Sequence, residues 1–129
     1  MNIFSVFRRR RRAAAHEIMA YREHKEKARA LVHARLLYWK DIHPFEHAQV
    51  RIKNHRRAWG SCSSKKNLNF NWRIISLPSE LADYVIVHEL CHTVHLNHSP
   101  AFWALLTSFV PNMRELRAQL RGVAIAPAS

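Results

Sequence analysis

The chain has 129 residues, of which 48% are hydrophobic, and a formal net charge of +12. This length allows one domain with a modest core, and the hydrophobic content is too high for a disordered chain. No apolar run approaches the roughly 20 residues that cross a bilayer, and two cysteines are too few for a secreted disulfide framework. We therefore expect a cytoplasmic protein with no membrane partner.

The positive charge is concentrated in the first part of the chain. Residues 1–57 contain fifteen Lys or Arg against five Asp or Glu, a net of +10, whereas residues 58–129 contain six against four, a net of +2. Five consecutive arginines occupy positions 8–12. Such asymmetry indicates an anionic partner, most often nucleic acid, but a solvated basic helix or a poorly ordered terminal arm explains it equally well.

The first half of the chain favours one long helix followed by short strands. Good helix formers are frequent from about Arg11 to Asp41, Gly and Pro are absent there, and Pro44 lies just beyond. A polar turn at residues 64–67 is typical of a hairpin. Alternating apolar and polar residues predict three strands, at residues 50–53, 58–63 and 68–73.

The second half favours helices. Pro78 and Ser79 open a helix that is expected to end near Leu96–Asn97, where Asn97 can adopt a left-handed cap. Ser99-Pro100 begins the next helix, and Asn112 caps a last one that ends at Gly122. Three strands and four helices in this order predict an α+β fold. In it, a small three-stranded antiparallel or mixed sheet packs on the helix that opens at Pro78, with other helices at the flanks.

That helix carries the sequence His88-Glu89-Leu90-Cys91-His92. Positions i and i+4 share one helix face, so His88 and His92 can offer two imidazole nitrogens to one metal ion. Glu89 lies beside the first of them, where its carboxylate can take a proton from a water molecule that the metal activates. Ordinary core histidines are the alternative. However, two histidines and a glutamate in a largely apolar helix need partners, and a metal ion is the simplest one.

Two histidines compete for the third ligand position. His95 shares the face of His88 on an unbroken helix, but about 10 Å of axial rise separates the two, which is too long for both to reach one ion. His98 follows a turn, after which the chain can return over the metal. Three protein ligands plus water is the open coordination of a catalytic zinc, so the pattern predicts one zinc ion per chain, held by His88, His92 and His98. His95 and Tyr84 are then candidates to support the ligands or the substrate without binding the metal.

Four blocks of the sequence resemble the YgjP-like metallopeptidases, which are zincin-type proteins akin to the SprT and WLM groups. The blocks occur in family order at residues 57–63, 68–73, 83–92 and 97–103, and the resemblance covers roughly residues 47–118. It implies a zincin-like fold, zinc bound by His88, His92 and His98, and Glu89 as the general base.

The sequence departs from the family pattern at two places. Lys66-Asn67 stands at a turn where glycine is common, although Asn tolerates the left-handed conformation. A basic helix also replaces the longer β-rich N-terminal part that many family members carry.

The strand before the hairpin is a candidate for substrate binding. Zincin peptidases commonly hold the substrate as an added strand at the sheet edge, which makes Gly60, Ser61 and Trp59 candidate substrate-binding residues. The alternative places Trp59 and Trp72 together as core aromatics, with Gly60 at a bulge.

The leading function is hydrolysis of peptide bonds by a zinc metallopeptidase, with a peptide or protein as substrate and Glu89 as general base. Two alternatives remain open. One is a nucleic-acid-associated protein whose basic arm brings the catalytic fold to proteins bound to DNA or RNA, and the other is a zinc-binding module that cleaves nothing. The predicted organisation is a basic N-terminal arm and helix at residues 1–46, a zincin-like metallopeptidase domain at residues 47–122 and a tail at residues 123–129.

Overall fold

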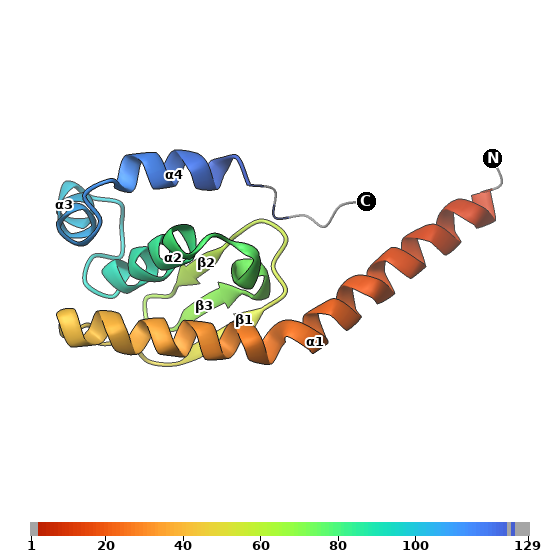
Figure 1. Cartoon of the computed structure of the whole chain (residues 1–129), viewed down its shortest axis with the longest axis horizontal. Coiled ribbons are helices and arrows are strands. Elements are labelled where there is room, and N and C mark those ends of the chain that lie inside the picture. The colour runs from red at the N-terminus through yellow and green to blue at the C-terminus, as the bar shows by residue number, and fades with distance from the viewer. Residues whose placement is uncertain (1–2, 124, 126–129) are drawn as a thin grey trace.

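The computed structural model describes residues 3–123 and 125, and α2 lies at the centre of its fold. Its helices and strands are α1 (Ile3–Ile42), β1 (Val50–Lys53), β2 (Gly60–Cys62), β3 (Leu68–Asn71), the short 3-10 helix η1 (Trp72–Ser76), α2 (Ser79–His92), α3 (Pro100–Phe109) and α4 (Met113–Arg121). The central helix contacts the sheet, α1, α3 and α4 (Figure 1). The predicted α+β class, with a small sheet packed on the helix that opens at Pro78, is confirmed.

The three strands form a mixed sheet in the order β1-β3-β2. β1 pairs in parallel with β3, and β2 pairs antiparallel with β3, so that Ile52 and Gly60 both lie opposite Phe70. Leu68 and Phe70 alternate towards the core and are fully buried. The outer side of β1 is partly covered, because the Tyr21 hydroxyl of α1 donates to the Ile52 carbonyl at 3.1 Å.

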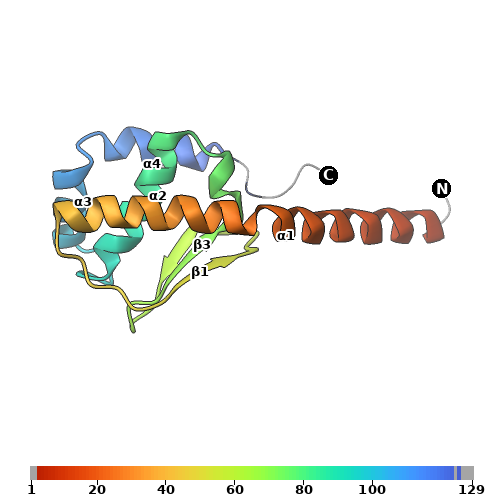
Figure 2. The ribbon, with the colours of Figure 1, turned by 60° about the horizontal axis from the view of Figure 1, so that its bottom comes forward.

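The long helix α1 has two parts with different surroundings. In its second part, Ala28, Val32, Leu36 and Trp39 recur every three or four residues and are buried against the body. In its first part the arginines at positions 8–12 are exposed, and the helix projects away from the body in both ribbon views (Figures 1 and 2). The prediction of a helix here is confirmed, but the helix is longer than expected because Arg is itself a good helix former.

The central helix is buried on most sides, as its apolar composition predicts. Its buried residues are Leu81, Ala82, Tyr84, Val85, Ile86, Val87, Glu89, Leu90 and Cys91. Phe102 and Leu106 of α3 are fully buried beside them. Within the described part of the chain, no helix is both long enough and apolar enough to cross a membrane.

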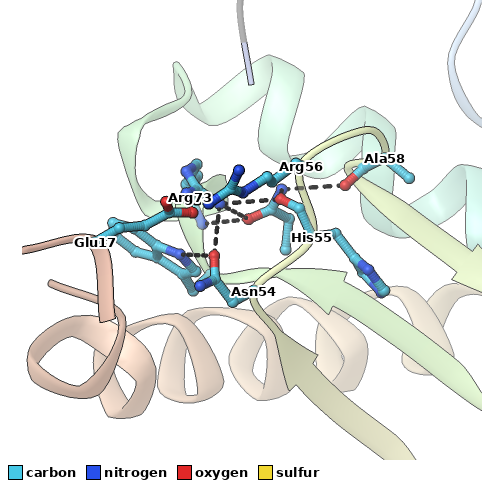
Figure 3. Close-up of polar contacts among 8 residues, drawn as sticks. Glu17, Asn54, His55, Arg56, Ala58 and Arg73 are labelled. Carbon is cyan, nitrogen blue, oxygen red and sulfur yellow. Dashed lines mark hydrogen bonds and ion pairs between the residues drawn. The ribbon is translucent and has the colours of Figure 1, made fainter. Parts of the chain in front are cut away.

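A buried ion pair ties α1 to η1, and its arginine also contacts the segment that precedes β2. The Glu17 carboxylate accepts a hydrogen bond from Arg73 at 2.8 Å, and each of these residues is 7% exposed. The side chains of Arg73 and Asn71 also donate to the His55 carbonyl, at 3.0 and 2.7 Å (Figure 3). Because the loop of residues 54–58 leads directly into β2, this network positions the strand that borders the site described below.

Two strand boundaries and one turn differ from the sequence-based expectation. β2 is shorter than predicted, and β3 ends at Asn71 because the Asn71 side chain accepts a backbone N–H and starts η1. Trp72 therefore leaves the strand alternation. In the hairpin, Lys66 rather than Asn67 takes the left-handed conformation, with φ of 65°. The Asn67 side chain instead accepts the backbone N–H of Gln49 at 3.1 Å.

The end of α2 also differs from the expectation. The helix ends at His92, and Thr93 closes it by donating its hydroxyl to the Leu90 carbonyl at 2.6 Å. Among the described non-glycine residues, positive φ occurs at Lys66, so the predicted left-handed cap at Asn97 is wrong. Asn112 does precede α4, although its side chain makes no capping hydrogen bond. Most of the predicted tail lies outside the described residues.

Candidate metal centre and cleft

Three imidazole rings from two segments converge at the C-terminal end of α2. His88 and His92 project from this helix one turn apart, and His98 lies in the loop before α3. The Nε2 atom of His98 lies 3.1 Å from Nε2 of His92 and 3.4 Å from Nε2 of His88. One nitrogen of each ring lies within 4.8 Å of the other two. The structure thus brings together the three histidines that the sequence selects as metal ligands.

This donor set fits a zinc ion. In tetrahedral coordination, Zn–N distances of about 2.0–2.1 Å separate two ligand nitrogens by about 3.3 Å. The two Nε2 separations of 3.1 and 3.4 Å match that value. Imidazole nitrogens suit zinc, and three of them leave a further position open, as in catalytic rather than structural zinc sites.

Surrounding groups keep two of the rings neutral. Burial, together with the smaller electrostatic effects of His92, His98 and Arg117, lowers the pKa of His88 to about 3. Burial also lowers the pKa of His92, although a hydrogen bond to the His95 carbonyl opposes this effect. Neutral rings carry the lone pairs that a metal requires.

Neighbouring groups also fix the orientation of the His92 and His98 rings. With Nδ1 of His92 donating to the His95 carbonyl at 3.0 Å, the lone pair on Nε2 faces the other two rings. Phe102 stacks on His92 with ring centroids 4.3 Å apart, and Trp103 stacks on His98 at 5.3 Å. The His95 main-chain carbonyl, beyond the end of α2, thus contacts His92, and a role for the His95 side chain stays a prediction.

Glu89 is a buried carboxyl group beside the metal-ligating face. It is 7% exposed, and burial raises its pKa to about 8. A cation held by the three histidines would lower this pKa, because an opposite charge favours the carboxylate. The carboxyl group can therefore exchange a proton near neutral pH, which is the property that a general acid–base residue needs.

Gly60 allows β2 to approach Glu89 closely. A Cβ atom at Gly60 would lie 3.0 Å from Glu89 Cγ and 3.2 Å from the Asn69 carbonyl oxygen. Both contacts are tighter than ordinary van der Waals packing. Gly60 also pairs regularly with Phe70, so the alternative of a bulge at this glycine is wrong.

A cleft of ≈ 360 Å³ opens beside Glu89. Its walls are Trp59 and Gly60 at β2, Tyr84, Val85, His88 and Glu89 of α2, Arg117, Leu120 and Arg121 of α4, and Val123 and Ile125 beyond that helix. Ser61 is exposed on β2 and does not line this cleft. Trp59 is both a core residue, 9% exposed, and part of the wall.

Tyr84 lies against the metal centre, as its proposed supporting role requires. Its ring meets the edge of His88 with centroids 5.7 Å apart. Burial raises the pKa of Tyr84, while the charges of Arg117 and Arg121 act in the opposite direction. The phenol therefore stays protonated at neutral pH.

The two cysteines lie apart from the three-histidine cluster. Burial, together with the charge of Glu89, raises the pKa of Cys62 to about 11 and that of Cys91 to about 12. Neither belongs to the group of side chains that converges on the metal position.

Sequence reasoning missed the arginines of the cleft wall. Arg117 and Arg121 are four residues apart and so share one face of α4. This spacing is visible in the sequence, but nothing local indicates that α4 packs beside Glu89. Nothing in the local sequence indicates that Phe102 and Trp103 stack on the histidines.

Comparisons with known proteins agree with this geometry. The family model described as YgjP-like, metallopeptidase domain matches residues 5–122. The crystal structure of the metallopeptidase zymogen of Pyrococcus abyssi abylysin shares 23% identity with a TM-score of 0.62, over 69% of this chain and 90% of that chain. The zymogen of Methanocaldococcus jannaschii jannalysin shares 25% identity with a TM-score of 0.53, over 74% and 97%. No curated protein matches the chain. The structural likeness confirms the predicted zincin-like fold.

Proposed function

The chain belongs to the YgjP-like metallopeptidase family, and from this membership we propose that it hydrolyses peptide bonds with one zinc ion held by His88, His92 and His98. The observation that carries the proposal is the convergence of three Nε2 atoms at the edge of a cleft that Glu89 also lines. A non-catalytic zinc-binding module has no need of a buried, titratable carboxyl group at this position.

Each residue of the site has its own role in the proposed reaction. Zinc, when bound, would act as a Lewis acid towards the scissile carbonyl and the attacking water. Glu89 accepts the proton of that water and returns it to the leaving amine, and its buried position favours both transfers near neutral pH. Tyr84 lines the same cleft and its ring contacts His88, which makes its hydroxyl the candidate donor to a substrate oxygen.

The substrate backbone is proposed to lie along β2. This strand is at the edge of the sheet, and Gly60 sets its separation from Glu89. An extended peptide can add to such an edge through main-chain hydrogen bonds, with Trp59, Gly60 and Ser61 beside it. The peptide bond to be cut would then lie in the cleft beside Glu89 and His88.

Gly60→Ala is expected to reduce kcat about tenfold to a hundredfold while zinc content stays the same, because the new Cβ atom displaces the Glu89 side chain. The measurement is steady-state cleavage of an unstructured protein, with zinc determined on the same sample. Gly122→Ala is the matched control, since a Cβ atom there meets the Gln119 carbonyl at 3.4 Å, an ordinary contact. Equal kcat in the two variants would remove Gly60 from the positioning of Glu89.

A second candidate function concerns the basic arm, the exposed part of α1 that contains residues 8–12. Five consecutive residues point in all directions around a helix, so the arginines surround the arm, and Ile3, Phe4 and Phe7 are exposed just before them. A separate groove of ≈ 420 Å³ between α1 and β1 is lined by Lys25, Arg29, Arg51 and Lys53, of which Arg29 pairs with Glu26. These features support the proposal that the arm binds nucleic acid and brings the peptidase to bound proteins. A cytoplasmic location remains a prediction.

Binding of the arm to nucleic acid is expected to weaken log-linearly with salt, because each Lys or Arg contact with a phosphate releases counterions. Deleting residues 1–12 should reduce the slope of log affinity against log salt by up to about 4–5, and should leave peptide cleavage intact. Duplex and single-stranded oligonucleotides, titrated at several salt concentrations, measure this slope. An unchanged slope, or no binding at low salt, would leave the arm as a solvated helix.

A further inference from the structure

Two guanidinium groups face the cleft from the side opposite β2. Arg117 and Arg121 lie one turn apart on α4, and both line the ≈ 360 Å³ cleft that contains Glu89. A peptide added to β2 would therefore have the sheet on one side and these two cations on the other. The two arginines belong to a half of the chain that carries little net charge.

Neither cation has an acidic partner within the described residues. The ion pairs found there join Arg29, Arg35, Arg56 and Arg73 to carboxylates elsewhere. Glu115 is two positions before Arg117, and residues at that spacing do not face one another on a helix. Among residues 3–123 and 125, no carboxylate forms an ion pair with either arginine, although Glu89 lines the same cleft.

Arg117 is nevertheless held in place. Its guanidinium lies over the Trp103 ring, 4.8 Å from the ring centroid, and Trp103 in turn stacks on His98. This contact links the exposed Arg117 side chain, through Trp103, to the three-histidine cluster. A preorganised guanidinium binds a carboxylate with less loss of side-chain entropy than a free one.

Apart from Tyr84, His88 and Glu89, the rest of the wall beside the arginines is apolar. Val85 and Leu120 lie there together with Trp59. A group that fits such a surface has an apolar stem and an anionic end, as a glutamate side chain or the C-terminal residue of a peptide has. Resting on the proposed peptidase function, we propose that Arg117 and Arg121 form a subsite that binds a carboxylate of the peptide substrate close to the scissile bond.

The subsite is tested first by binding, with Glu89→Gln protein loaded with zinc so that no cleavage intervenes. The probes are fluorescein-labelled nine-residue peptides of Ala, Gly and Leu, with a single Glu at each position in turn, and matched peptides with Gln. A second pair has a free C-terminal carboxylate or a C-terminal amide. We expect one acidic peptide to bind about tenfold more tightly than its neutral partner. The position of the preferred carboxylate distinguishes an internal side chain from the C-terminus.

Variants assign that preference to the two arginines. Arg117→Gln and Arg121→Gln should each reduce the ratio of acidic to neutral affinity, and the double variant should abolish it. Arg114→Gln is the matched control, because Arg114 is an exposed arginine of the same helix that does not line the cleft. Equal affinities of every acidic and neutral pair, or a preference that survives in the double variant, would overturn the proposal.

The same peptides test the carboxylate subsite and the peptidase function independently of each other. With active protein, the acidic preference should appear in KM more than in kcat, since the subsite binds a group that does not react. Preferred binding of the acidic peptide without any Glu89-dependent cleavage would support the subsite and contradict the peptidase function. Cleavage that is indifferent to the acidic residue would support the function and contradict the subsite.

Discussion

Glu89→Gln is expected to keep one zinc ion per chain and to lose about 10²- to 10⁴-fold in kcat, the usual contribution of a general acid–base residue. Glutamine has the size of glutamate, so the close contact with Gly60 is retained. It cannot accept the proton of the attacking water. Turnover of an unstructured protein, with zinc measured by elemental analysis, provides the readout.

A loss of activity in this variant should not come from a loss of fold. Burial raises the pKa of Glu89, which means that the charged carboxylate is costly at this position, and the neutral amide removes that cost. We therefore expect the unfolding temperature to be unchanged or higher. Glu80→Gln, at the exposed start of the same helix, is the matched control and should keep full activity. Unchanged turnover in Glu89→Gln would refute the general-base role.

His98→Ala is expected to lose stoichiometric zinc, whereas His95→Ala should keep it. The Nε2 atom of His98 faces those of His88 and His92, while His95 contributes its main-chain carbonyl, which an alanine retains. Elemental analysis after dialysis against a weak chelator measures the difference. Activity should follow zinc content, because the open coordination position exists only when the metal is bound.

The converse pattern would reassign the third ligand. Zinc that is retained in His98→Ala but lost in His95→Ala would show that the loop after α2 closes in another way. Loss in both variants, with an unchanged unfolding temperature, would point to a site that involves both side chains. His33→Ala, an exposed histidine of α1, controls for histidine removal in general.

The sequence by itself determined the parts of this site that depend on neighbours along the chain. His88 and His92 share a helix face because of their four-residue spacing, and Glu89 follows the first of them. The order of strands and helices also follows from local periodicity and from residues that start or end elements. The errors of the sequence-based prediction are local as well. Thr93 ended α2 sooner than Asn97 was expected to, and Asn71 turned β3 into η1.

The tertiary structure decided which distant segments meet. Gly60 contacts Glu89 because β2 packs on α2, and Glu17 pairs with Arg73 across 56 positions of the chain. Arg117 enters the cleft because α4 folds back beside the same helix. Hydrophobic periodicity specifies which face of an element is buried, but not which other element covers that face. The cleft, and with it the proposed carboxylate subsite, therefore follows from packing between elements rather than from any one stretch of sequence.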